Sequence, residues 1–120
     1  MNEIVQSNLH DRVPRAERIA RLNDQLRKTA IGGAIVVTRG VRNLSDYSTQ
    51  ALFEALRTYD GFDEDNDPHG ERDFGDIDLW DAELLWKIDY LSPDMQFGSN
   101  DPADPYVTQR VLTVLLAEEY

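Results

Sequence analysis

The sequence of 120 residues contains no cysteine, and its longest apolar run covers only positions 30–37. Without cysteine the chain forms no disulfide, no thiolate metal site and no thiol nucleophile, which suits a reducing cytoplasm. The apolar run includes two glycines, and a membrane-spanning helix needs about twenty apolar residues. The first ten residues also lack the basic and apolar stretches of a secretory signal. We therefore expect a soluble, cytoplasmic protein that does not enter a membrane.

Basic residues are scarce in the second half of the chain. Residues 1–59 carry nine Arg or Lys and six Asp or Glu, a balance of +3, whereas residues 60–120 carry three and seventeen, a balance of −14, which together give the net charge of −11. An acidic half repels nucleic-acid phosphates and attracts cationic proteins. Acidity also keeps proteins soluble, so charge by itself leaves both readings open. The basic segment 12–28 is either a solvated helix face, paired to the acidic half, or a contact surface.

The composition predicts one folded domain. Hydrophobic residues make up 41% of the chain, and a domain of this size buries roughly two thirds of its unfolded surface, which is enough for one core. Residues 1–12 are polar and aperiodic, as is typical of a flexible N-terminal arm. We predict a single α+β domain over residues 13–120.

Apolar spacing and turn residues predict the elements of this domain. Apolar residues recur every three to four positions over 14–29, which predicts a helix. The glycine-bounded, β-branched segment 34–40 predicts a strand. A second helix over 46–59 is expected after Ser45 as its N-cap. An aspartate followed by a proline predicts the start of a last helix over 105–120.

Residues 73–91, DFGDIDLWDAELLWKIDYL, alternate between apolar and charged side chains and predict a β-hairpin. With the turn at Asp81 and Ala82, apolar pairs fall on one face and an ion pair on the other. This register pairs Leu79 with Leu84, Ile77 with Trp86, and Asp76 with Lys87. The predicted element order is α-β-α-β-β-α, with three helices packed on a small antiparallel or mixed sheet of three to four strands.

Six segments, in this order along the chain, resemble a bacterial family known as domain of unknown function 3768. They are RIARLNDQLR (18–27), VVTRGV (36–41), EDNDPHGERDFG (64–75), WKIDY (86–90), GSNDPADP (98–105) and RVLTVLLAEEY (110–120). The resemblance covers roughly residues 18 to 120 and departs at the hairpin turn, where the family pattern has Asp-Gly. It implies a bacterial, cytoplasmic setting and assigns no activity.

Six carboxylates and one arginine lie within residues 62–75, FDEDNDPHGERDFG, directly before the hairpin. Such an array attracts basic protein surfaces and speeds association. An acidic protein can also occupy a basic nucleic-acid-binding channel by imitating phosphates. The candidate partner-binding residues are Asp63, Glu64, Asp65, Asp67, Glu71, Asp73, Asp76 and Asp78.

We therefore predict an acidic protein-binding module rather than an enzyme, with no cofactor and no metal assigned. The expected role is an inhibitor or regulator, a DNA mimic or anti-CRISPR protein for example, of a basic bacterial partner such as a restriction or CRISPR effector. A third interpretation is that the loop only supports the fold, with its aspartates capping backbone amides.

Two metal-based interpretations stand beside this prediction. Counted from Asp65, an EF-hand-like calcium loop would use Asp67, His69, Gly70 and Asp76, although histidine is a poor calcium ligand and position 12 normally carries glutamate. Alternatively, a metal-dependent hydrolase or nuclease would use Asp76, Asp78 and Lys87 on one face of the hairpin. The surrounding charge has the wrong sign to hold a phosphate substrate.

Overall fold

The computed structural model describes residues 13–120, and the predicted arm over residues 1–12 lies outside the described part. It confirms an α+β fold with three helices, a four-stranded mixed sheet and a short final 3-10 turn in this part. The elements in chain order are α2 (Arg15–Thr29), β1 (Ala34–Val37), α3 (Arg39–Arg42), α4 (Thr49–Thr58), β2 (Phe74–Leu79), β3 (Ala82–Leu91), β4 (Gln109–Leu116) and η1 (Ala117–Glu119). No described helix is both long and apolar enough to cross a membrane.

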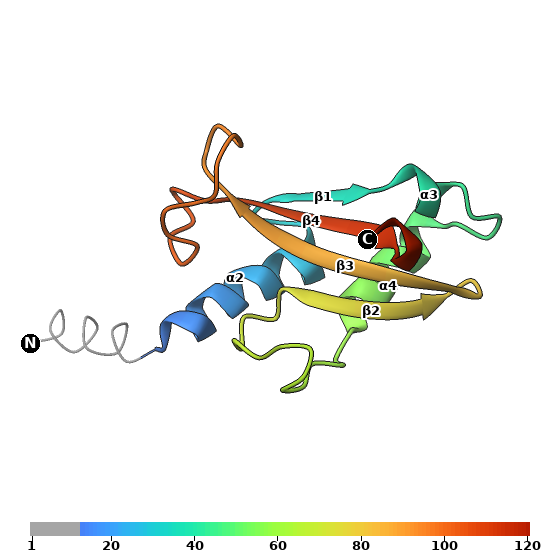
Figure 1. Ribbon diagram of the computed structural model, residues 1–120, viewed down its shortest axis with the longest axis horizontal. Coiled ribbons are helices and arrows are strands. Elements are labelled where there is room, and N and C mark those ends of the chain that lie inside the picture. The colour runs from blue at the N-terminus through green and yellow to red at the C-terminus, as the bar shows by residue number, and fades with distance from the viewer. Residues whose placement is uncertain (1–12) are drawn as a thin grey trace, which may run out of the picture.

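The sheet has the strand order β1-β4-β3-β2, so β1 and β2 are its two edges. β1 runs parallel to β4, and the other two pairs are antiparallel. Helices α2 and α4 cover one face of the sheet, and the other face is turned toward the viewer in Figure 1.

The core lies between the sheet and these helices. It takes alternate residues from the two central strands, as expected for a sheet with one covered face. Trp86 on β3 is fully buried and is the largest side chain of this core. The buried core residues are Leu26, Val41, Leu52, Leu56, Leu84, Trp86, Ile88, Leu112 and Val114.

The predicted helix over residues 105–120 is wrong. Residues Gln109–Leu116 form β4, the central strand between β1 and β3. Arg110, Leu112 and Val114 are buried on one face at a spacing of two, the period of a strand. The aspartate before the proline caps a turn instead, since Asp104 Oδ1 accepts a hydrogen bond from the N–H of Tyr106 at 2.9 Å.

The predicted hairpin over residues 73–91 forms, but its register differs by two residues. Trp80 and Asp81 make the turn with φ of 57° and 56°, as in the two-residue type I′ turn that matches strand twist. Asp76 therefore lies across from Leu85, and not from Lys87 as predicted. Because the shift is even, every side chain keeps its predicted face. Trp86 is buried and Asp76 is exposed, as expected.

Candidate functional site

The acidic loop between α4 and β2 is tied to helix α2 by the arginine at position 72. The Arg72 guanidinium lies 2.8 Å from Asp24 Oδ2 and 3.3 Å from Glu17 Oε1. The hydrogen bond from Arg72 lowers the pKa of Glu17, and the hydrogen bond to Asp24 raises the pKa of Arg72. The only arginine of residues 62–75 thus binds carboxylates of α2, which lies far from the loop in sequence.

A buried polar network fixes the end of the same loop. Tyr90 Oη donates to Glu71 Oε1 at 2.8 Å and accepts from Asn23 Nδ2 at 2.8 Å. The Asn23 side chain also accepts from Arg110 Nε at 2.9 Å, and both residues are buried. Burial raises the pKa of Tyr90 and lowers the pKa of Arg110. Glu71 is therefore bound to this network and helps to hold the end of the loop in place.

Two loop aspartates cap backbone amides. Asp63 Oδ1 accepts from the N–H groups of Asp65 and Asn66, both at 2.9 Å. Asp67 Oδ1 accepts from the N–H of Arg72 at 3.0 Å. These bonds are the turn chemistry of the fold-supporting interpretation.

Asp73, the last residue before β2, is partly shielded from solvent. Burial raises the pKa of its carboxyl group above the ordinary value, and the charge of Glu71 adds to the increase. Together with Glu71, Asp63 and Asp67, this residue belongs to a group of four predicted site residues that hold the loop or lie partly inside it.

The other four predicted residues face solvent. Glu64, Asp65, Asp76 and Asp78 are exposed, and none of them takes part in an ion pair within residues 13–120. The prediction thus collected two groups of carboxylates with different surroundings.

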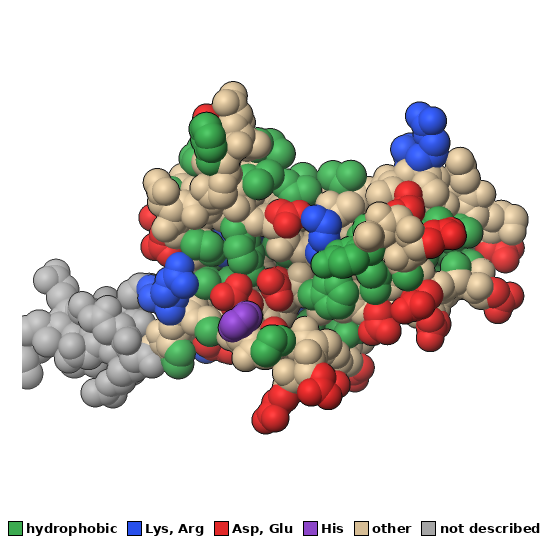
Figure 2. All heavy atoms as spheres, viewed as in Figure 1, with side chains coloured by type: hydrophobic (Ala, Val, Ile, Leu, Met, Phe, Trp, Pro, Cys, Tyr) green, Lys and Arg blue, Asp and Glu red, His purple; other side chains and the backbone are tan. Residues whose placement is uncertain are grey.

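Further carboxylates extend the exposed group around the end of the hairpin. Asp78, Asp81 and Glu83 line one shallow hollow, and Glu118 of η1 lines the hollow beside it with Asp81 and Glu83. In Figure 2, acidic side chains gather along the margin of the molecule that carries β2 and this hairpin end. We call this group the hairpin acidic surface; it comprises Asp76, Asp78, Asp81, Glu83 and Glu118.

Sequence reasoning missed Asp81, Glu83 and Glu118. The sequence predicts Asp81 as a turn residue, and a turn position gives no sign of a binding surface. Glu83 could have been found from the alternation of β3, had the register of the turn been known. Glu118 was assigned to a helix that does not form, so no sequence signal connected it with the hairpin.

Asp78 and Glu83 are direct partners in the β2–β3 register. Both are exposed, and neither forms an ion pair with any described residue. Like charges directly opposite one another in an antiparallel pair are destabilising. The nearest lysine along the hairpin, Lys87, instead contacts Asp89 Oδ2 of its own strand at 2.6 Å.

The residues of the two metal-based interpretations do not converge. Among residues 13–120 no three His, Asp or Glu side chains come together in a way that could hold a metal ion. Of the proposed hydrolase group, Lys87 lies across from Phe74 and forms its ion pair with Asp89, not with Asp76 or Asp78.

Comparison with known proteins identifies the family of the chain. Residues 37–119 match a family described as a protein of unknown function, DUF3768. No curated protein and no solved structure matches the chain. The match covers more than half of the sequence and spans α3, α4, the acidic loop, the hairpin and β4. The chain therefore belongs to the DUF3768 family.

Proposed function

We propose that this protein is a protein-binding module that docks its hairpin acidic surface on a basic surface of a partner protein. The observation that carries the proposal is the opposition of Asp78 and Glu83, neither of which forms an ion pair in the described part. Destabilising arrangements such as this like-charge pair are expected at functional sites, where the function that they provide offsets the lost stability. A lysine or arginine of a partner would remove this repulsion on binding.

The surroundings of the pair support docking on a protein. Trp80 and Leu79 line the same hollow as the carboxylates and are partly exposed. Tryptophan is enriched among the residues that contribute most to protein interfaces. The Trp80 ring is held edge-on against Tyr47, with centroids 5.5 Å apart, so this apolar anchor is fixed before a partner arrives.

We extend the proposal to a partner that normally binds nucleic acid, which would make the protein an inhibitor or regulator of, for example, a restriction or CRISPR effector. Alternate residues of a strand lie about 6.7 Å apart and on the same face of the sheet. Asp76 and Asp78 therefore present two negative charges at this spacing along β2. A row of carboxylates without cations is the kind of surface that a phosphate-binding channel attracts. No observation favours the hydrolase alternative.

The test is a charge-matched pair of variants. The site variant combines Asp78→Asn with Glu83→Gln. The control combines Asp46→Asn with Asp60→Asn, two exposed carboxylates outside the surface. Partners are captured from a bacterial lysate with the parent protein at low salt, and association rates are then measured for each purified partner.

We expect the site variant to associate about tenfold more slowly than the parent at low salt, with a flatter salt dependence, because steering depends on local charge. The control should behave like the parent. Equal rates for the two variants would contradict the proposal, as would a set of captured partners that carries no basic surface.

A further inference from the structure

β1 is an open edge of the sheet. On one side it pairs with β4, and no described strand lies on its other side. Thr38, which directly follows β1, donates its N–H to Val114 O of β4 at 3.0 Å. Backbone groups of a strand point alternately to its two sides, so Ile35 and Val37 direct their N–H and C=O groups outward. These four groups are the pattern that an added strand recognises.

The two edges of the sheet differ in their protection. β2 carries Asp76 and Asp78, and charges on an edge strand discourage pairing with another chain. β1 has the sequence AIVV, with neither charge nor proline. Its Val36 side chain is 46% exposed, and Ile31 just before the strand is 61% exposed. The β1 edge is therefore accessible, apolar and unprotected.

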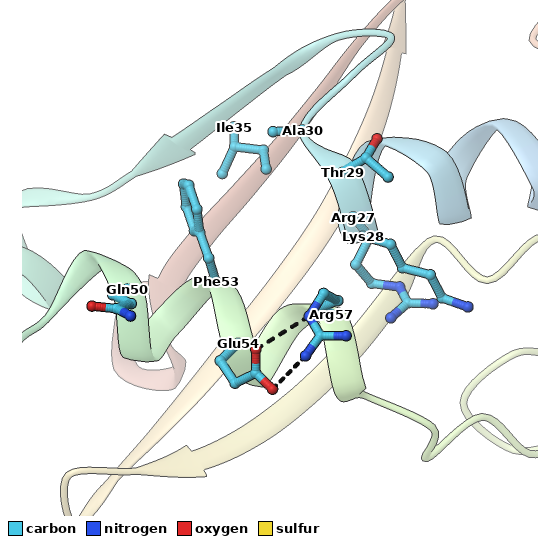
Figure 3. Close-up of a pocket in the computed structure, with 9 residues that line it drawn as sticks. All are labelled: Arg27, Lys28, Thr29, Ala30, Ile35, Gln50, Phe53, Glu54 and Arg57. Carbon is cyan, nitrogen blue, oxygen red and sulfur yellow. Dashed lines mark hydrogen bonds and ion pairs between the residues drawn. The ribbon is translucent and has the colours of Figure 1, made fainter.

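A groove accompanies this edge. It has a volume of about 280 Å³ and lies between β1, the end of α2 and one face of α4. Phe53 of α4 points toward Ile35 of β1 and Ala30, and these side chains form its apolar wall (Figure 3). Ligand pockets for whole small molecules start at roughly 300 Å³ and enclose their ligand. This open groove has the size for one large side chain.

Basic residues lie in the groove and at both ends of the edge, and the two carboxylates nearby already have partners. Glu54 pairs with Arg57, and Glu119 accepts a hydrogen bond from Thr38 Oγ1 at 2.8 Å. Lys28 and Arg57 line the groove, and Arg57 is held by Glu54 at 2.5 Å. Arg39 follows the far end of β1. Neither Lys28 nor Arg39 forms an ion pair within residues 13–120. The edge therefore has a cation at each end, in contrast to the acidic opposite margin of the sheet.

We propose that the β1 edge and its groove bind an extended acidic peptide segment of a partner protein. The segment adds as an antiparallel strand beside β1, the more stable pairing, and bonds to the outward groups of Ile35 and Val37. One apolar side chain of the segment enters the groove against Phe53. Acidic residues at its two ends face Lys28 and Arg39.

The basic residues at the two ends of β1 favour an acidic peptide over a second copy of the chain as the occupant of this edge. Two β1 strands paired about a two-fold axis would place the Lys28 end of one copy beside the Arg39 end of the other. Like charges at such positions cost stability, whereas an acidic peptide neutralises both. The proposal does not depend on the hairpin acidic surface, which is built on β2, the hairpin end and η1 and includes no residue of β1 or of the groove.

The experiment uses the full chain and two libraries of fluorescent nine-residue peptides. Both libraries alternate apolar and polar positions; the polar positions are Asp or Glu in one and Lys in the other. Binding is measured by fluorescence anisotropy, and the contact site is located by amide NMR. We expect the acidic library to yield binders that shift and protect the amides of Ile35 and Val37.

Two variants test the contacts, each with a matched control elsewhere. Phe53→Ala and Lys28→Glu should each weaken binding by about tenfold. Phe97→Ala, which removes another exposed aromatic ring, and Arg21→Glu, which reverses another charge of α2, should bind like the parent. The Asp78→Asn/Glu83→Gln variant should also bind these peptides normally, which separates this proposal from the proposed function.

Three results would overturn the inference. The lysine library could bind as well as the acidic one, or the binders could leave the amides of Ile35 and Val37 unchanged. In the absence of peptide, protection of these two amides that grows with protein concentration would assign the edge to a second copy of the chain.

Discussion

Asp78 and Glu83 face one another across β2 and β3, and neither forms an ion pair with a described residue. Neutralising one should stabilise the fold. We expect Asp78→Asn to raise the free energy of unfolding by about 0.5 kcal/mol, the order of a cross-strand pair term. Urea denaturation at low salt measures this gain, which should shrink at high salt because exposed charges are screened. Asp76→Asn, across from Leu85, is the control and should gain less.

The tight packing of Gly75 against two aromatic side chains predicts the effect of adding one methyl group there. A Cβ at Gly75 would lie 2.5 Å from Trp86 Nε1 and 2.6 Å from Tyr59 Cζ, whereas a Cβ at Gly98 would meet no atom within 4 Å. We expect Gly75→Ala to lower the free energy of unfolding by about 1–3 kcal/mol, the range for overpacking a core. Thermal and urea unfolding measure the loss. An equal loss in Gly98→Ala would contradict this account.

The ion pairs of Arg72 predict that the acidic loop contributes to stability. Arg72→Met removes two carboxylate contacts between the loop and α2, and we expect a loss of about 1 kcal/mol, since the side chain is partly exposed and the pairs are partly screened. Arg21→Met breaks one exposed pair with Glu17 and should change stability by less than about 0.5 kcal/mol. Hydrogen exchange should show faster opening of the loop only in the Arg72 variant.

The raised pKa of Asp73 predicts a pH dependence of defined sign. The folded state favours the protonated carboxyl group, so this residue's stabilising contribution is present at low pH and is lost as pH rises through its folded pKa, which lies above the ordinary 3.8. Asp73→Asn cannot lose a proton. Its melting temperature should exceed that of the parent at pH 7, and the difference should shrink below the folded pKa. A difference independent of pH would refute the assignment.

Sequence patterns correctly predicted the elements whose secondary structure depends mainly on their own residues. Helix α2 follows from its apolar spacing, and the hairpin follows from the alternation of apolar and charged residues in β2 and in the second half of β3. The N-cap of α4 was placed at Ser45, but Ser48 caps the helix, with Oγ accepting from the N–H of Ala51 at 3.2 Å. Both serines are of a type that favours the N-cap and both lie just before the apolar-periodic segment, so this local pattern does not distinguish them.

β4 was missed because its neighbours decide its structure. The segment RVLTVLL places apolar residues at spacings that suit both a helix and a strand, and pairing with β1 and β3 selects the strand. The site shows the same limit. Whether a loop carboxylate is internal depends on Arg72, Asn23 and Tyr90, and the last two lie in other parts of the chain. The sequence therefore shows where the carboxylates are, but it does not predict which of them are bound inside the fold and which face solvent.

The position of β4 has a consequence for how the protein is made. β4, one of the two central strands, comes last among the described strands, and it is the only described partner of β1, which is synthesised more than seventy residues earlier. Until residues 109–116 have left the ribosome, β1 has no strand beside it and the core lacks Leu112 and Val114. Closing so long a loop slows folding. During synthesis the nascent chain therefore leaves β1 unpaired on both sides and β3 open on the side that β4 will occupy. Such open strands favour aggregation or capture by a chaperone in this period.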